Sequence, residues 1–122
     1  MAHELSDETR KQLIEFQQNQ QQLQMLAYQE QALKAQEMEV KKALEEISKG
    51  GEKFYRYAGS IIVPKSGGEL DKELKQEKEE LELRIKLFGK QVEKLRKKGG
   101  ELRESLEKAL PRQGGDGAQI SG

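Results

Sequence analysis

The side chains that could do chemistry in this chain are arranged for binding and not for catalysis. Its one histidine, His3, lies alone near the N-terminus, so a metal site is not expected there. The 22 acidic residues are interspersed with 22 Lys and Arg residues, which favours a solvated charged surface over a carboxylate pair for acid–base catalysis. The sequence holds no Ser/His/Asp arrangement, P-loop or dinucleotide fingerprint. It therefore predicts a protein that is not an enzyme and uses no cofactor and no metal.

The composition limits the classes of fold. Hydrophobic residues make up 34% of the 122 residues and charged residues 36%, against about 45–50% and about 25% in ordinary soluble domains. A deep core around a roomy pocket is therefore not expected. The chain has no Cys, which excludes disulfides and thiol catalysis. A signal-peptide pattern and a membrane-spanning run are also lacking, so we expect a cytoplasmic protein without a membrane partner.

The charge balance predicts long solvated helices and argues against nucleic-acid binding. The net charge is +0, whereas a nucleic-acid-binding face needs a basic excess. A zipper that binds DNA would also carry a basic region ahead of its heptads, and none precedes them here.

Glycine-rich breaks divide the chain into four predicted parts. These are a helix over 1–49, a short segment over 50–68, a second helix over 69–110 and a flexible tail over 111–122.

Both long segments have the heptad spacing of a coiled coil. Ser6 is the predicted N-cap of the first helix, and Ser66 with Glu69 has the spacing of a capping box for the second. The seam of the first helix is polar at three positions, Asn19, Glu30 and Glu37. Its apolar positions are Phe16, Leu23, Leu26, Leu33, Val40, Leu44 and Ile47. The second helix has two rows, one of Leu74, Leu81, Phe88, Leu95, Leu102 and Ala109, the other of Lys78, Ile85, Val92, Gly99 and Leu106.

The segment between the helices is rich in aromatic and β-branched residues, which is typical of strands. Phe54–Ala58 and Ser60–Val63 are the expected strands, with a tight turn at Gly59-Ser60. The two helices have similar lengths, so we expect them to fold back into an antiparallel pair in which facing residue numbers sum to about 119. The predicted fold class is mainly α: a long antiparallel two-helix coiled coil joined by a single β-hairpin.

A lone hairpin is marginally stable in water, and its open edges tend to pair with other strands. We therefore expect hairpins from several chains to assemble into one sheet or into an inter-subunit β-barrel. A cap on a two-helix stalk is the alternative. The expected oligomerisation residues are Tyr55, Tyr57, Ile61 and Val63 on one face, with Phe54 and Ile62 on the other.

In the order and the residues of these elements, the sequence resembles the beta-type prefoldin subunits, and the archaeal ones in particular. The matching residues are Lys42–Ile47, the hairpin Phe54–Val63, Glu80–Ile85, Gln91–Leu95 and the glutamine-rich stretch Gln17–Gln24. The resemblance implies a hexamer of two alpha and four beta subunits that acts as an ATP-independent holdase chaperone. It further implies capture of unfolded polypeptides at the coiled-coil tips and their delivery to a group II chaperonin.

The two ends that lie far from the hairpin are the predicted client-binding tips. Leu13 and Ile14 are adjacent, so both cannot be buried in a narrow two-helix seam, and some apolar surface should stay exposed. Ordinary seam packing is the alternative. The predicted tip residues are Leu5, Leu13, Ile14, Phe16, Leu102, Leu106 and Leu110.

Gly99 and Gly100 interrupt the second helix at a seam position opposite the polar residues Asn19 and Gln20. Each glycine costs about 1 kcal/mol in a helix interior relative to Ala. We predict a flexible joint that lets the distal part of the helices spread around clients; tolerated sequence drift is the alternative.

A structural coiled-coil scaffold or adaptor, built from chains that pair as long dimers, remains the rival function. The mass of the native assembly separates the two, because a scaffold predicts a dimer and the resemblance predicts a hexamer formed with alpha-type partners.

Overall fold

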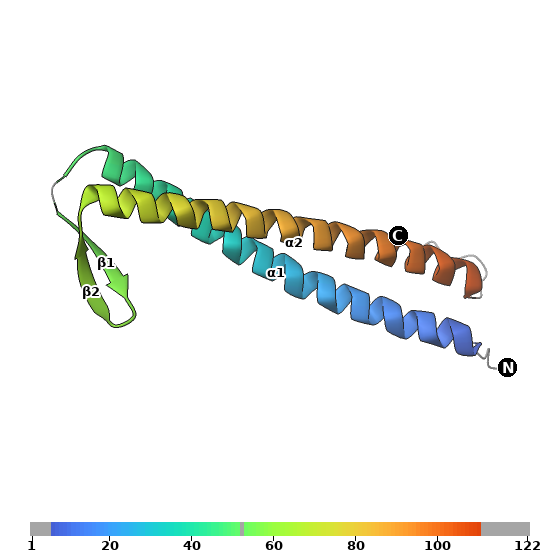
Figure 1. Ribbon diagram of the computed structural model, residues 1–122. Helices are drawn as coiled ribbons and strands as arrows, with labels where there is room; N and C mark the ends of the chain where they lie inside the picture. The colour runs from blue at the N-terminus through green and yellow to red at the C-terminus, as the bar shows by residue number, and fades with distance from the viewer. Residues whose placement is uncertain (1–5, 52, 111–122) are drawn as a thin grey trace, which may run out of the picture. The chain divides into compact units, whose positions relative to one another are not determined.

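A computed structural model describes residues 6–51 and 53–110 of the chain. The order of elements is helix α1 (Asp7–Ser48), strand β1 (Phe54–Ala58), strand β2 (Ile61–Lys65) and helix α2 (Gly67–Ala109), as Figure 1 shows. The predicted helix–hairpin–helix order and fold class are confirmed. His3, Leu5 and the predicted tail over 111–122 lie outside the described residues.

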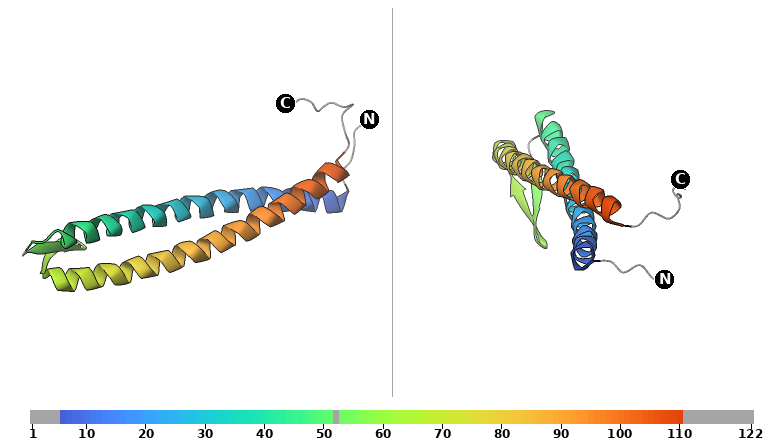
Figure 2. Two further views of the ribbon diagram at one scale, coloured as in Figure 1. Left: turned by 90° about the horizontal axis from the view of Figure 1, so that it is seen from above. Right: turned by 90° about the vertical axis from the view of Figure 1, so that its right-hand side faces the viewer.

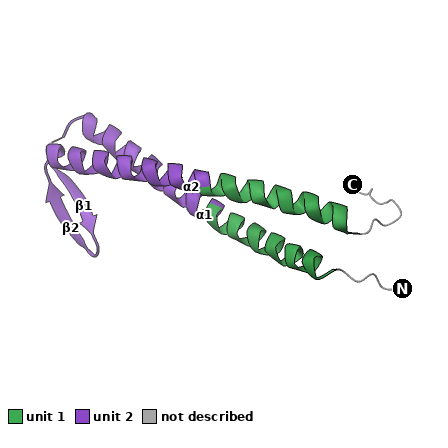
Figure 3. Ribbon diagram, turned by 45° about the vertical axis from the view of Figure 1, so that its right-hand side comes forward, with its two compact units in different colours: residues 1–26, 91–122 green, residues 27–90 purple. Residues whose placement is uncertain are grey.

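The chain divides into two compact units, which Figure 3 colours separately. Unit 1 consists of Met1–Leu26 and Gln91–Gly122, and unit 2 of Ala27–Lys90. Each unit holds a stretch of both helices, and unit 2 also holds the hairpin. Figure 2 shows that each helix ribbon is uninterrupted along its length, and α2 continues through Gly99 and Gly100.

Both helices begin at the predicted caps. The backbone N–H of Thr9 donates to Ser6 Oγ at 3.0 Å, and Asp7 and Glu8 occupy the first turn of α1. The backbone N–H of Glu69 donates to Ser66 Oγ at 3.1 Å, and the Ser66 N–H donates to Glu69 Oε1 at 3.1 Å. This reciprocal pair makes Ser66 the N-cap, so α2 starts at Gly67, two residues before the predicted boundary.

In unit 2 the two helices bury an apolar seam. Its core consists of Leu33 and Val40 from α1 and Leu70, Leu74 and Leu81 from α2. Half-buried hydrophobic residues pack against this core, namely Ala43, Leu44, Ile47, Phe54, Ile85 and Phe88. Glu30 lies opposite Gly89, and its Oε2 is 3.6 Å from where a Cβ on Gly89 would be. These numbers sum to the predicted 119, so the antiparallel register is confirmed in this unit.

In unit 1 the seam is apolar on α2 and partly polar on α1. Val92, Leu102 and Leu106 are buried on α2, whereas the buried α1 residues are Thr9 and Asn19. Asn19 Nδ2 donates to the Leu95 carbonyl at 2.9 Å, and Ser105 Oγ donates to Gln12 Oε1 at 3.0 Å. The predicted seam extends along α2 to Leu106, but Ala109 is exposed. Its exposure follows from its place in the last turn, where α2 ends.

The hairpin closes through the predicted two-residue turn, where Gly59 has a φ of 67°. The strands pair as Phe54↔Lys65, Tyr55↔Pro64, Arg56↔Val63, Tyr57↔Ile62 and Ala58↔Ile61. Directly opposed residues share a face, so Tyr55 and Tyr57 share theirs with Ile62 and Pro64. The predicted assignment of faces was therefore wrong: Ile61 and Val63 lie with Phe54, and Ile62 lies with the tyrosines. The physical reason is that a two-residue turn pairs odd-numbered residues of one strand with even-numbered residues of the other.

In residues 6–51 and 53–110, α1 and α2 are both too polar for either to cross a lipid bilayer.

Candidate functional site: a two-faced hairpin and the helix ends

The inner face of the hairpin, which we define as Phe54, Arg56, Val63 and Lys65, is attached to its own chain. Phe54 packs against the apolar core of unit 2. Its ring lies against two glycines, with Cζ 3.1 Å from where a Cβ on Gly51 would be and Cε2 3.3 Å from the same position on Gly67. Gly51 also has a φ of 136°, which L-residues rarely adopt. Gly51 in the loop before β1 and Gly67 at the start of α2 thus leave space for the Phe54 ring.

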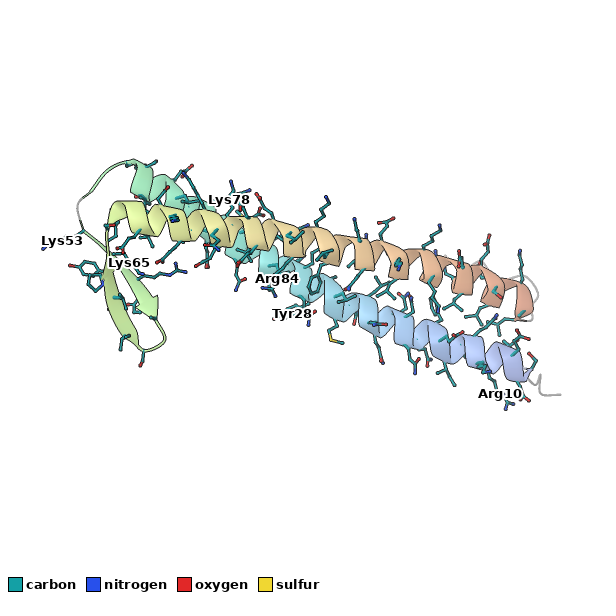
Figure 4. The ribbon with its side chains drawn as sticks, viewed as in Figure 1. Arg10, Tyr28, Lys53, Lys65, Lys78 and Arg84 are labelled. Atoms are coloured by element: carbon teal, nitrogen blue, oxygen red, sulfur yellow. The ribbon has the colours of Figure 1, made fainter. Side chains whose placement is uncertain are left out.

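Charged groups strengthen this attachment. Arg56 Nη1 donates to Glu73 Oε1 at 3.0 Å, Arg56 Nη2 donates to Glu77, and Lys65 Nζ donates to Glu73 Oε2 at 2.6 Å. Figure 4 labels Lys65 where the hairpin meets α2. The hydrogen bond from Lys65, followed by that from Arg56, holds the pKa of Glu73 below its usual value, and burial opposes this shift. The hydrogen bond to Glu77 raises the pKa of Arg56. One arginine and one lysine therefore tie both strands to two successive turns of α2.

This ion cluster was not predicted from the sequence. Glu69, Glu73 and Glu77 recur every four residues along one side of the second helix, which was a visible signal. Their basic partners could not be assigned, however, because the pairing depends on how the hairpin folds against α2.

The outer face of the hairpin, which we define as Tyr55, Tyr57, Ile62 and Pro64, is exposed. Tyr57 is 76% exposed, Tyr55 61% and Ile62 55%. Ile61, next to the turn on the inner side, is 61% exposed as well. Of the predicted oligomerisation residues, Tyr55, Tyr57, Ile61 and Ile62 are therefore free in the single chain, whereas Phe54 and Val63 are half-buried. The result is an apolar surface with an aromatic row, on a strand pair whose edges are both open.

The two open edges of the hairpin differ in their hydrogen-bonding capacity. In a two-residue hairpin the pair next to the turn exchanges hydrogen bonds, and such pairs alternate along the ladder. The N–H groups of Tyr55 and Tyr57 consequently point outward from β1. On β2 the outward positions are Ile62 and Pro64, and Pro64 has no N–H to donate. β1 thus offers the more complete edge for pairing with another strand.

The predicted tip residues of unit 1 separate into buried and exposed positions. Leu102 and Leu106 are buried, Leu13, Phe16 and Leu110 are half-buried, and Ile14 is 55% exposed. The expectation that Leu13 and Ile14 cannot both be buried is confirmed. Met25, which was not predicted, is exposed in the same unit.

Gly99 is buried in unit 1 and lies opposite Asn19, as predicted. A Cβ on Gly99 would lie 2.4 Å from Asn19 Oδ1 and 3.2 Å from Gln20 Nε2, whereas nothing lies within 4 Å of the same position on Gly100. The two glycines of the predicted joint therefore have different surroundings. Gly99 leaves space for the Asn19 side chain, whereas Gly100 faces open space.

Comparisons with known proteins agree with this architecture. A family model described as "Prefoldin subunit" matches residues 10–113. The chain is 35% identical over 112 residues to a prefoldin subunit beta of Methanosarcina acetivorans, which covers 90% of this chain and 96% of that protein. It is 39% identical over 93 residues to the prefoldin subunit beta of Thermococcus onnurineus, with 75% and 80% covered.

A solved structure is similar as well. The crystal structure of the prefoldin beta subunit from Thermococcus strain KS-1 matches with a TM-score of 0.80 and 30% identity, over 92% of this chain and 100% of that one. The sequence matches, the helix–hairpin–helix order and this structural match agree with one another. The chain belongs to the prefoldin family, and the relatives to which it is similar are beta subunits.

Proposed function

We propose that this chain is the beta subunit of a cytoplasmic, ATP-independent holdase that captures unfolded polypeptides and delivers them to a group II chaperonin. Prefoldin subunits are non-enzymatic components of chaperones, so the function to be explained is binding. The observation that carries the proposal is the two-faced hairpin, because one face is attached to the chain and the other is apolar and uncovered.

The hairpin is the proposed assembly site. A two-stranded sheet with four large exposed apolar side chains, three of them on its outer face, gains stability when another hairpin covers them. Burial contributes roughly 25 cal/mol per Å² of apolar surface. In our proposal four such chains combine with two alpha-type subunits, and their hairpins form a β-barrel. Tyr55, Tyr57 and Ile62 supply the packing, and β1 supplies the edge.

The ends of the helices in unit 1 are the proposed client-binding tips. Ile14 offers apolar surface there without any rearrangement. Leu102 and Leu106 become available to a client only where the two helices separate, since they are buried in the seam. Each tip would bind weakly, and several tips on one assembly would raise the avidity.

Native mass spectrometry tests the assembly. We expect the chain to form a hexamer of two alpha and four beta subunits when an alpha-type subunit from the same cell is added. A dimer of this chain alone that does not bind the alpha-type subunit would favour the rival scaffold function.

Suppression of aggregation tests the capture of clients. Removing residues 1–16 and 102–122 should abolish suppression of a denatured client's aggregation while the hexamer persists. Because this truncation also removes seam residues, a point variant is needed. Ile14→Gln should weaken suppression, whereas the control Met38→Gln, which changes an exposed apolar residue of unit 2, should not. Equal suppression by both variants and the native chain would contradict binding at the tips.

A further inference from the structure

Charge is strongly segregated along α2, although the whole chain is neutral. Residues 69–82 contain seven acidic and three basic residues, whereas residues 84–98 contain seven basic residues and one acidic residue, Glu93. We call residues 84–98 the basic segment. Its seven cationic side chains are Arg84, Lys86, Lys90, Lys94, Arg96, Lys97 and Lys98, and all are exposed. This local excess of positive charge differs from the mixed charged surface that the composition of the whole chain predicts.

Among the described residues, no ion pair neutralises these charges. Ion pairs in residues 6–51 and 53–110 form at the hairpin and along the helices, but none of them involves a residue of the basic segment. Within unit 1, the basic residues Lys94 to Lys98 lie on α2, and α1 has no charged residue between Phe16 and Leu26. Lys86, Lys90, Lys94 and Lys98 follow one another at a four-residue spacing and repel one another, whereas Arg84, Lys86 and Lys97 each have a glutamate four residues away.

Apolar side chains accompany the charges. Leu83, which directly precedes the segment, and Leu87 are 58% and 51% exposed. Both lie on the side of α2 that faces away from Leu81 and Ile85. By helical spacing, Lys90 and Lys94 follow them on that side. A surface of leucines and lysines complements a polypeptide that carries both carboxylates and apolar side chains.

Nucleic acid fits this surface less well. Binding of single strands without sequence preference relies on exposed aromatic side chains on which bases stack, in addition to cations. The aromatic residue of the segment, Phe88, is half-buried and packs against the core of unit 2.

We propose that the basic segment binds acidic stretches of unfolded polypeptides. This inference rests on the proposed function, and it adds a preference for a class of client and a site away from the tips. Its electrostatic part acts over about 8 Å at physiological ionic strength, so binding is strongest at low salt.

The experiment uses two labelled unstructured peptides of equal length and identical apolar residues, one with Glu and one with Lys at its polar positions. Their affinities for the full-length chain are measured by fluorescence anisotropy. We expect the Glu peptide to bind at least about tenfold more tightly, and this preference to disappear near 1 M salt, where the screening length is about 3 Å.

Two variants of equal net charge locate the site. The first replaces Lys94, Arg96, Lys97 and Lys98 with Gln, which keeps helix propensity high. The control replaces four exposed lysines outside the segment that make no ion pair among the described residues, namely Lys11, Lys42, Lys72 and Lys108. The first variant should lose about tenfold in affinity for the Glu peptide, and the control less than about twofold. Circular dichroism checks that both remain helical. If the first does not, Arg84→Gln with Lys86→Gln and Lys90→Gln takes its place, and the control is then reduced to Lys11, Lys72 and Lys108 so that the net charges stay equal.

The outcomes are distinct. Equal losses in both variants, or equal affinity for the two peptides, would overturn the proposal. Tighter binding of a single-stranded oligonucleotide of the same charge than of the Glu peptide would also overturn it in favour of a nucleic-acid site. Loss of aggregation suppression in Ile14→Gln together with intact Glu-peptide binding shows that the tips and the basic segment act independently, so either proposal can fail alone.

Discussion

The Asn19 side chain occupies the space that a side chain on Gly99 would need. Asn19 is 5% exposed, its Nδ2 donates to the Leu95 carbonyl, and its Oδ1 lies 2.4 Å from where a Cβ on Gly99 would be. A polar group buried in a helical seam is stable only when it is hydrogen-bonded, and polar seam residues help to fix register. The glycine is therefore the counterpart of the asparagine in the packing of unit 1.

Alanine substitutions at the two adjacent glycines should have opposite effects. Gly100→Ala should raise the free energy of unfolding by about 1 kcal/mol, because the new methyl group faces open space and Ala favours helix. Gly99→Ala should lower it, because Asn19 must move and break its hydrogen bond to Leu95, at a cost of about 1–3 kcal/mol that exceeds the gain in propensity. Urea denaturation of both variants measures the contrast. Adding Asn19→Ala to Gly99→Ala should recover part of the loss, and equal effects at the two glycines would exclude the proposed packing.

The predicted joint at Gly99 and Gly100 has its own test. If these glycines loosen α2, amides near residues 99–104 should exchange with deuterium faster than those near residues 81–88, and Gly100→Ala should slow them. Gly100→Ala is the appropriate variant for this test, because a side chain on Gly99 would displace Asn19. Exchange at the same rate in the native chain and in Gly100→Ala would count against a joint.

Substitutions in β1 and β2 should separate assembly from folding. Tyr57→Asp with Ile62→Asp places charges on the outer face, so assembly should be lost while the helical content and the unfolding midpoint of the single chain stay nearly unchanged. Phe54→Ala is the matched contrast. It should lower the free energy of unfolding by about 2 kcal/mol, less than the 3–5 kcal/mol of a fully buried Phe, because the ring is half-buried. Light scattering and thermal melts measure the two effects, and a persistent hexamer in the double Asp variant would refute assembly through the outer face.

The ion cluster predicts a dependence on pH. The pKa of Glu73 is lowered in the folded chain from its usual value of 4.5, so its contribution to stability is fully present above pH 4.5. It should disappear as the pH falls below 4.5 through the folded pKa, because a protonated Glu73 no longer attracts Lys65 and Arg56. The protection factors of the hairpin amides, which are corrected for the slower intrinsic exchange at low pH, should therefore fall on acidification. Glu73→Gln should show fast exchange already at neutral pH and a weaker response to acid; an unchanged response would mean that another carboxylate is responsible.

The helices could be predicted from the sequence because their signals are local. Ser6, Ser66 and Glu69 are capping residues at the correct spacing, and the heptad rows from Leu33 to Val40 and from Leu74 to Leu106 are regular enough to fix the register of the pair. The end of the α2 seam at Leu106 could not be predicted from the sequence, because Ala109 suits a seam and a last turn equally well.

The faces of the hairpin could not be predicted with the same certainty. The residue types of Ile61, Ile62 and Val63 are alike, so only the pairing across the turn decides which of them lies beside Tyr57. The same applies to Arg56 and Lys65, whose acidic partners on α2 depend on tertiary packing. At the tips, the adjacency of Leu13 and Ile14 correctly predicted that they are not both buried, and the heptad rows correctly placed Leu102 and Leu106 in the seam.

The alternation of faces in the hairpin has a consequence for how this chain can change over evolutionary time. In β1, the even-numbered residues Phe54 and Arg56 bind the strand to its own chain, and the odd-numbered residues Tyr55 and Tyr57 are directed outward. If assembly uses the outer face as we propose, substitutions at the odd positions alter subunit recognition without unfolding the monomer, whereas substitutions at the even positions affect the monomer first. Neighbouring residues of one five-residue strand can thus change separately, one set for partner choice and the other for stability.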